Sequence, residues 1–473
     1  MSPLKNVRHQ SPLKLRPRER RGLLIIGDIL SLLLALFLAL YLWSLDDIYL
    51  DFSVEIFQRV PGWFFFLPIF FIILLSGLYD ERRAADPELT LRGIAFAAII
   101  SLVAYMGLYF ISEVALPRRG IAYFFAGAVV ITLLWRILYI RVFTAPHFQR
   151  RVILVGGGET GQIILRIVNE ITIKPFTLVG IIDDDPAKIG KLIEGYEVLG
   201  GSEKLLQFIT DKGITDLIVA ISGRMQGSMF QALLDAQEMG VDITRMPVAY
   251  EELLGRVPIR YLEADWILRS FVDQMRADAY YELLKRTLDI LGSLIGLILF
   301  LPLFPFIAFA IALDSGFPIF YTQIRMGKGG QLYNILKFRT MNRNAEPDGQ
   351  PKWAEENDRR ATRVGLFLRK THLDELPQFI NVLRGEMSLV GPRAERPELV
   401  EWFQQHVPFY RARLLVKPGI TGWAQVNQTY ASSIPETIEK LEYDLFYIKR
   451  RNLFTDIDIL FRTPATVLGL RGR

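Results

Sequence analysis

The uneven distribution of apolar residues constrains the fold of this chain most. Hydrophobic residues make up 51% of its 473 residues, and the excess lies in the first 143 positions and again in residues 288–313. Each apolar segment of the first part approaches the ~20 residues that an α-helix needs to cross a bilayer. The segments are Leu23–Trp43, Trp63–Tyr79, Ile94–Ser112 and Ile121–Phe143. Residues 1–147 are therefore predicted to form a four-helix transmembrane domain, and not a cleaved signal peptide.

Charged residues around these segments predict their orientation. Basic residues precede the first segment, separate the second from the third and follow the fourth, whereas the loop after the first segment is acidic. The basic residues are Arg16, Arg18, Arg20 and Arg21, then Arg82, Arg83 and Arg92, then Arg150 and Arg151. Arg118 and Arg119 are a mild exception. We expect both ends of the domain, and everything after Arg150, on the cytoplasmic side. Asp28, inside the first segment, is expected to make a polar contact between helices.

Composition excludes several classes of protein. The net charge is +5, from 55 basic and 50 acidic residues, which suits phosphates or anionic headgroups and is too weak to indicate nucleic acid. There is no cysteine, so disulfides, thiol nucleophiles and cysteine-bound metals are excluded. The four histidines are scattered without the spacing of metal ligands.

Residues 148–275 are predicted to form a Rossmann-like domain with a parallel sheet. Short apolar strands at Arg151–Val155, Leu178–Ile182 and Asp216–Ala220 alternate with helical stretches. This alternation is typical of α/β proteins.

A glycine-rich loop follows the first of these strands. Gly156-x-Gly158-x-x-Gly161 matches the dinucleotide fingerprint, and Asp183 ends the next strand, where an acid would bind ribose. One alternative is therefore a membrane-attached, NAD-dependent nucleotide-sugar dehydratase or epimerase. Tyr281-x-x-x-Lys285 has the spacing of such an enzyme's catalytic pair, but no second glycine-rich unit precedes it. We expect a regulatory or assembly role for this domain, with NAD or another nucleotide as an open question.

The second hydrophobic run, at about 288–313, contains Pro302 and Pro305. Each proline removes a backbone donor and clashes with the preceding turn, which predicts a kink near Leu301. A straight fifth span would place the C-terminal part outside the cytoplasm. A re-entrant helix that enters and leaves by one face is favoured.

Four motif blocks follow in residues 276–473. They are Lys285–Asp289; Gly316–Gly327 with Lys337–Met341; Arg369–Gln378; and Met387–Arg393 with Lys417–Trp423. Four blocks in this order resemble the bacterial sugar transferase family, also called monotopic phosphoglycosyl transferases. The whole chain is similar to the long form, in which four spans and a Rossmann-like domain precede the catalytic domain.

This resemblance implies a function. A member would transfer hexose 1-phosphate from a UDP-sugar, glucose or galactose by default, to undecaprenyl phosphate, releasing UMP through an aspartyl-phosphosugar intermediate. It would initiate a capsule, exopolysaccharide or O-antigen glycan at the bacterial inner membrane. The fold implied is an α/β membrane protein with a mostly helical catalytic domain, and a homodimer is expected. A non-catalytic assembly scaffold is a further alternative, against which the intact acidic residues argue.

The resemblance also assigns roles to residues. Asp374 is the nucleophile, and Glu375 is its partner, as general base or metal-site carboxylate. Asp374 would also bind magnesium, for which manganese could substitute, because such ions prefer oxygen ligands. The expected phosphate ligands are Lys337, Arg339, Arg393 and Arg325, and the expected lipid-phosphate mouth is Lys285, Arg286, Asp289 and Pro302. Pro377 favours the first turn of a helix, which places the two acids near a helix start.

Three positions differ from the common family pattern. His372 stands in place of a serine, Ala394 in place of a proline, and Asn427-Gln428-Thr429 in place of Asn-Gly-Arg. The last change lies in a region that we connect with sugar choice, so the sequence does not identify the sugar.

Overall fold

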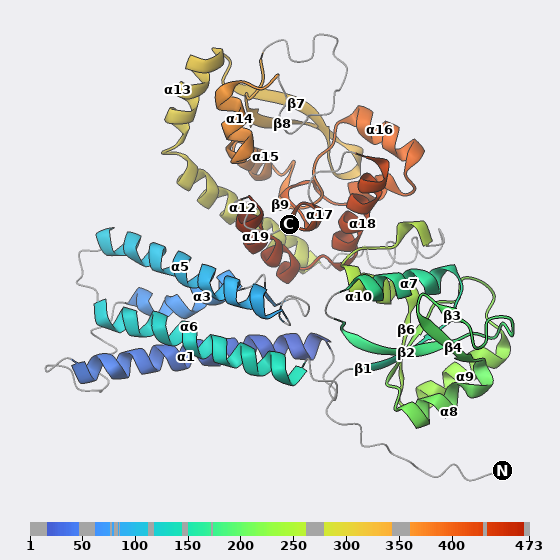
Figure 1. Ribbon diagram of the computed structural model, residues 1–473. Coiled ribbons are helices and arrows are strands. Elements are labelled where there is room, and N and C mark those ends of the chain that lie inside the picture. Colours follow the sequence, from blue (N-terminus) through green and yellow to red (C-terminus); the bar gives the residue numbers. More distant parts are fainter. Residues whose placement is uncertain are drawn as a thin grey trace. The chain divides into compact units, whose positions relative to one another are not determined.

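The computed structural model describes residues 17–46, 62–75, 78–79, 84, 86–111, 118–143, 150–171, 174–261, 279–342, 360–428 and 433–467 (Figure 1). They form two compact units, one within Met1–Met246 and one within Pro247–Arg473.

The first unit begins with apolar helices. Three of them, α1 (Pro17–Asp46), α5 (Pro87–Ile111) and α6 (Arg118–Phe143), are long and apolar enough to cross a membrane. The second predicted span is occupied by the short helices η1 (Gly62–Phe66) and α3 (Leu67–Leu75). Figure 1 shows α1, α3, α5 and α6 side by side. Three of the four predicted spans thus coincide with helices of sufficient length, and the four-span bundle stays a prediction.

A buried ion pair joins α1 to α6. The Arg136 Nη2 atom lies 2.7 Å from Asp28 Oδ2, and the two side chains are 1% and 0% exposed. The predicted polar contact of Asp28 is therefore confirmed. Removing one partner of such a buried pair costs about 3–5 kcal/mol, because the other charge is left uncompensated. Gly27 allows the helices to approach, since a Cβ there would lie 2.0 Å from the Trp135 ring.

A six-stranded sheet follows the apolar helices. Its order is β3-β4-β2-β1-β5-β6, and every neighbouring pair is parallel except β3 with β4. The strands are β1 (Arg150–Val155), β2 (Phe176–Ile182), β3 (Leu192–Ile193), β4 (Tyr196–Gly200), β5 (Asp216–Val219) and β6 (Asp242–Arg245). The predicted parallel α/β domain is confirmed. The central strand β1 is an unbroken apolar run from Val152 to Val155 because both faces of the sheet are covered.

Helices cover both faces of this sheet. Figure 1 shows α7 (Glu159–Glu170) on one face, and α8 (Ser202–Lys212) and α9 (Gly227–Glu238) together on the other. Strand β1 lies between β2 and β5, and the chain first builds the sheet on the β2 side and then continues with β5 on the other side. The strand order therefore reverses at β1, and the glycine-rich loop after β1 lies at this switch point.

The second compact unit begins at Pro247. Residues 247–261, which include most of α10 (Met246–Leu254) and η4 (Ile259–Tyr261), belong to this unit, and the predicted domain bounds stay a prediction. Contacts explain this division. Lys449 and Arg450 bind the buried Glu251 at 2.6 and 3.2 Å, and Trp423 Nε1 donates to the Gly255 carbonyl at 2.8 Å.

The proline-containing hydrophobic run forms two helices, α12 (Ala279–Phe300) and α13 (Phe304–Ser315), with a 64° bend between them. The predicted break near Leu301 is confirmed. By length and composition the pair is either one broken span or a re-entrant loop. Large apolar side chains on both helices and in the break between them are exposed, including Leu299, Leu301, Phe306 and Leu313 at 69–73%. The re-entrant course stays a prediction.

The rest of the unit is mostly helical, as expected, with two short strand pairs that were not predicted. The antiparallel pair is β7 (Phe320–Met326) with β8 (Leu332–Phe338), and the turn η5 (Lys328–Gly330) joins them. The parallel pair is β9 (Ser388–Val390) with β10 (Gly419–Thr421). The helices are α14 (Arg363–Lys370), η6 (Leu373–Glu375), α15 (Gln378–Arg384), α16 (Pro397–His406), η7 (Tyr410–Leu415), α17 (Trp423–Asn427), α18 (Ile434–Arg450) and α19 (Leu453–Val467).

Candidate active site

The acid pair lies on a tight turn between two helices. His372, with φ of 56°, reverses the chain after α14, and Asp374 and Glu375 follow in the single turn η6. Histidine is among the residues that tolerate this left-handed conformation best. Pro377 then caps α15, so the acids do precede a helix as predicted. Both acidic residues are 8% exposed.

Two cations meet on one oxygen of Glu375. Lys337 Nζ, from β8, and Arg393 Nη2, from the loop after β9, each lie 2.7 Å from Glu375 Oε1. Charge-assisted bonds of this length are among the stronger ones in proteins. The structure thus brings together four of the predicted site residues: Asp374, Glu375, Lys337 and Arg393.

The two acids titrate in opposite directions. Burial alone would raise the pKa of Glu375, but the cations of Arg393 and Lys337 outweigh burial and hold that pKa far below its usual range. Burial raises the pKa of Asp374, and the negative charge of Glu375 adds to the rise, while Lys337 and Arg393 oppose it. The surroundings of Glu375 therefore favour its anion, whereas those of Asp374 favour protonation.

Asp374 keeps its carboxylate available. Among the described residues, no side chain or backbone group donates a hydrogen bond to it. No group of three His, Cys, Asp or Glu side chains in the described part of the chain could hold a metal on its own. A single carboxylate nevertheless fits magnesium at a diphosphate, because this ion commonly takes one or two carboxylates, substrate phosphate oxygens and water.

Two predicted phosphate ligands have other contacts. Arg339 Nη2 lies 2.9 Å from Ser315 Oγ and also bonds to the Gly316 carbonyl, at the end of α13. Arg325 donates to the Ala394 carbonyl at 3.1 Å and to Gln323 at 2.6 Å. These contacts connect the arginines to the framework and do not bring them to Glu375.

An ionic network that no sequence motif indicated supports Arg393. Arg413 donates to the Arg393 carbonyl at 3.0 Å and to Asp444 at 2.8 Å. Lys440 lies 2.7 Å from Glu395. Burial would raise the pKa of Glu395, but Lys440 and Arg413 lower it to about 2. These residues lie outside the four motif blocks, so no local pattern identified them.

The predicted lipid-phosphate mouth is largely used for internal contacts. Lys285 Nζ lies 3.0 Å from Asp456 Oδ2 and 3.1 Å from the Val390 carbonyl. Arg286 donates to two carbonyls at the end of α15, each at 2.7 Å. Asp289 accepts from Ser388 Oγ and the Leu389 N–H, both at 2.9 Å. Pro302 lies in the break between α12 and α13.

The Tyr281–Lys285 spacing has a structural explanation. Both side chains bind Asp456 Oδ2, at 3.0 Å each, from successive turns of α12. One helical turn separates positions i and i+4, which is why both reach the same carboxylate.

The glycine-rich loop has the backbone of the fingerprint, but its acid is already bound. Gly156 has φ of 103°, and a Cβ at Gly161 would meet the Gly156 carbonyl at 2.1 Å, so both glycines are required by the turn itself. A Cβ at Gly158 has room, with its nearest contact at 4.0 Å. Asp183 accepts from the Gly157 N–H at 2.7 Å and from Lys188 Nζ at 2.9 Å.

Family models match two parts of the chain. The model described as bacterial sugar transferase matches residues 280–469, and that described as CoA-binding domain matches residues 74–247. The first includes the acid pair and both of its cations.

Curated relatives match this chain over different shares of its length. The UDP-N-acetylgalactosamine-undecaprenyl-phosphate N-acetylgalactosaminephosphotransferase of Aeromonas hydrophila is 43% identical over 46% of this chain. The chain spans only 50% of that relative. The UDP-glucose:undecaprenyl-phosphate glucose-1-phosphate transferase of Xanthomonas campestris pv. campestris is 29% identical over 84% of both chains. The UDP-galactose-lipid carrier transferase of Erwinia amylovora is 31% identical over 69% of both.

A solved structure, titled as RSP in complex with beta-NADH, aligns with 33% of this chain and 92% of its own. Its identity is 17% and its TM-score is 0.19, which is too slight a likeness to support an argument.

Proposed function

The chain belongs to the bacterial sugar transferase family, and on this premise we propose that it transfers hexose 1-phosphate from a UDP-sugar to undecaprenyl phosphate. The observation that carries the proposal is the buried pair in which Glu375 is neutralised by Lys337 and Arg393 while Asp374 has no hydrogen-bond donor among the described residues. A carboxylate in this setting has two cations nearby and lone pairs that no described protein group occupies, which suits a nucleophile at a diphosphate.

In the first step an oxygen of Asp374 attacks the phosphorus that carries the sugar. The new bond is an acyl phosphate, the bond to the bridging oxygen breaks, and UMP leaves with that electron pair. Lys337 and Arg393 stabilise the charge that develops on the phosphoryl oxygens, since preorganised cations act most strongly in a partly dehydrated site.

In the second step a phosphate oxygen of undecaprenyl phosphate attacks the same phosphorus. The acyl phosphate bond breaks, Asp374 is regenerated as a carboxylate, and the sugar remains on the lipid through a diphosphate. The two steps replace one difficult displacement by two easier ones.

Glu375 acts as a positioning residue in this scheme. A general base must accept a proton near the working pH, and the low pKa of Glu375 makes it a poor acceptor. Its carboxylate holds Lys337 and Arg393 at the place where the diphosphate charge arrives.

Magnesium, or manganese in its place, would be held by Asp374 together with the diphosphate. When bound, the ion would neutralise charge on the phosphate oxygens. Removal of divalent cations with EDTA should abolish UMP release, and magnesium should restore it.

We also propose the topology and the setting of the reaction. Four spans and a re-entrant α12–α13 would keep the second unit on the cytoplasmic face, where UDP-sugars are made. The glycan would be a capsule, exopolysaccharide or O-antigen. The homodimer implied by the long form is testable by light scattering in detergent.

The test measures UMP release from UDP-glucose, UDP-galactose and UDP-N-acetylgalactosamine, with undecaprenyl phosphate and magnesium. Wild type is compared with Asp374→Asn, which keeps the shape of the side chain but removes its charge, and with Asp314→Asn as a control on an exposed acid. We expect one donor to give UMP, Asp314→Asn to match wild type, and Asp374→Asn to lose at least about a thousandfold. NAD-dependent turnover of a UDP-sugar without UMP release would overturn the proposal.

A further inference from the structure

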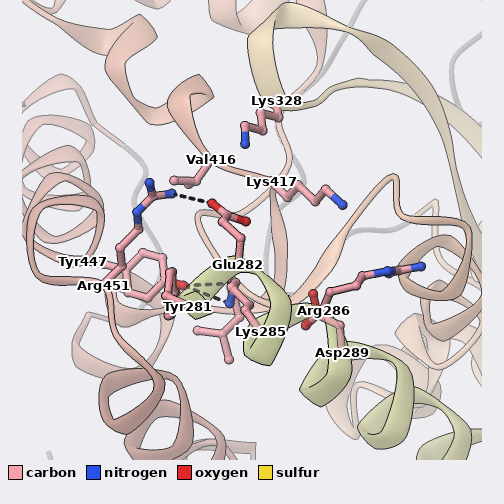
Figure 2. A pocket seen from close by; sticks show the side chains of 11 residues that line it. Tyr281, Glu282, Lys285, Arg286, Asp289, Lys328, Val416, Lys417, Tyr447 and Arg451 are labelled. Carbon is pink, nitrogen blue, oxygen red and sulfur yellow. Dashed lines mark hydrogen bonds and ion pairs between the residues drawn. The ribbon is translucent and has the colours of Figure 1, made fainter. Parts of the chain in front are cut away.

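A basic pocket lies beside the first turns of α12. It encloses about 420 Å³, including space open to solvent, and Figure 2 shows the side chains around it. Some of its charges are paired: Lys285 binds Asp456, and Arg451 lies 3.5 Å from Glu282. The cations Arg286, Lys328 and Lys417 also line it.

These last three cations have no carboxylate partner within 4 Å among the described residues. Among the described residues, Arg286 donates its hydrogen bonds to carbonyl oxygens at the end of α15. In Figure 2 no dashed line joins Lys328 or Lys417 to another residue. Lys417 Nζ and Arg286 Nη2 both lie within 3.7 Å of the point where a Cβ on Gly385 would stand, so the two charges are neighbours. Clustered like charges cost stability, and this cost indicates a function.

Glycines shape the backbone around the two lysines. The segment with Lys417, just before β10, packs closely against Gly391, because a Cβ on Gly391 would lie 2.4 Å from the Lys417 carbonyl. Lys328 begins the turn η5, in which Gly329 and Gly330 have φ of 68° and 82°. Burial lowers the pKa of the Lys417 ammonium, and the nearby charge of Arg286 lowers it further. An anion in the pocket would relieve this repulsion.

The position of the pocket indicates which anion. It adjoins residues 281–289, and exposed apolar side chains continue along α12 beyond them, from Leu291 to Leu299. A phosphate in the pocket could therefore have its hydrocarbon chain along α12. A second hollow, which contains Arg393, shares Val416 with this pocket. Arg286 contacts the far end of α15 from the acid pair, a helix of seven residues and so ~10 Å long.

We infer that this pocket captures the phosphate monoester of the polyprenyl acceptor, with Lys328, Lys417 and Arg286 as its cationic ligands, before the phosphate advances past Arg393 to Asp374. The inference rests on the proposed function. Lys417 and Lys328 are then the principal ligands of the lipid phosphate, in place of the predicted Lys285, which Asp456 neutralises.

The test uses full-length protein in nanodiscs of phosphatidylcholine and the double variant Lys328→Gln/Lys417→Gln. Arg363→Gln, on an exposed cation of α14 outside the pocket, is the matched control. Two rates are measured: transfer at varied undecaprenyl phosphate, and exchange of labelled UMP into the UDP-sugar without acceptor. We expect the double variant to raise the acceptor KM about 10- to 100-fold and to leave exchange unchanged, because charge-assisted bonds to phosphate are lost only from the acceptor.

Its thermal midpoint should equal or exceed that of wild type, since two mutually repelling charges are gone. An unchanged acceptor KM would overturn the inference, as would an equal fall in exchange, which would assign the pocket to the nucleotide.

Direct binding separates this inference from the proposed function. Wild type and the double variant are titrated with undecaprenyl phosphate, neutral undecaprenol and phosphatidylglycerol. If the double variant binds undecaprenyl phosphate more weakly but the other two lipids as wild type does, the inference is supported even if no donor is turned over. Equal loss of phosphatidylglycerol binding would assign the pocket to bulk phospholipid and overturn it. If wild type neither exchanges UMP nor forms a lipid-linked sugar with any donor, the proposed function fails independently.

Discussion

The glycine-rich loop of the first unit and the basic pocket of the second are both places where a phosphate-bearing ligand could be sought. In the loop the acid is satisfied by its own surroundings: Asp183 accepts from Gly157 and Lys188, and a Cβ on Gly157 would lie 2.8 Å from Ile193. In the pocket, by contrast, Lys328 and Lys417 make no ion pair with a described residue, although Glu282 and Asp289 also line it.

A sequence motif by itself therefore does not establish that a ligand binds. The fingerprint describes a backbone geometry that a strand–helix turn can use for its own packing. Like charges that lie together without an ion-pair partner, such as those of Lys417 and Arg286, indicate a ligand more directly, because an anion beside them would offset their repulsion.

The largest expected effect that sharpens this comparison is on turnover. Glu375→Gln should reduce the rate of UMP release about 100- to 1,000-fold, because Lys337 and Arg393 lose the carboxylate that positions them. Asp183→Asn, the matching change in the glycine-rich loop, should leave the rate within about twofold. Equal losses in the two variants would show that the loop takes part in the reaction.

The pH profile gives the next effect. The nucleophile must be ionised, and burial raises the pKa of Asp374. The acid limb of the profile should therefore have its midpoint above ~4, the pKa of an ordinary aspartate. Below that midpoint turnover should fall about tenfold per pH unit. The profile of kcat/KM between pH 4 and 8 checks this. An acid limb that lies at or below the ordinary value would contradict the assignment.

Nicotinamide binding tests the loop itself. Because Asp183 is engaged by Lys188 and Gly157, titration of the full-length protein with NADH should show no saturable fluorescence change up to ~1 mM, which corresponds to a binding free energy weaker than about −4 kcal/mol. Saturation at micromolar NADH would reverse the comparison between the two regions.

The last prediction concerns the stability of the fold near α10, which lies in the chain between the glycine-rich loop and the basic pocket. Burial raises the pKa of Glu442, which accepts from Tyr250 on this helix, to about 7. The native state then keeps a proton that the unfolded state loses at lower pH, so the free energy of unfolding should fall as pH rises toward 7. The fall is at most about 3.4 kcal/mol, from 1.36 kcal/mol per pKa unit.

Glu442→Gln should flatten this dependence without changing the KM of either substrate. Thermal unfolding of both proteins at pH 5 and pH 7.5 measures the difference. If the thermal midpoints of wild type and Glu442→Gln depend on pH to the same extent, Glu442 is not the group responsible for the pH dependence of stability.

The sequence by itself determined the features that depend on local pattern. The apolar segments, the break near Leu301 and the parallel sheet followed from hydropathy, proline chemistry and the alternation of strands with helices. The motif blocks identified Asp374 and Glu375 as the acid pair, and the two are adjacent because they are consecutive in the chain.

Only the tertiary structure decided which distant charges meet. Lys337 and Arg393 converge on Glu375, whereas Arg339 and Arg325, from the same motifs, turn to the framework. Lys285 is neutralised by Asp456, 171 positions away. The physical reason is that a long cationic side chain can serve any anion within its reach, and strand register, helix packing and turns decide which anion that is.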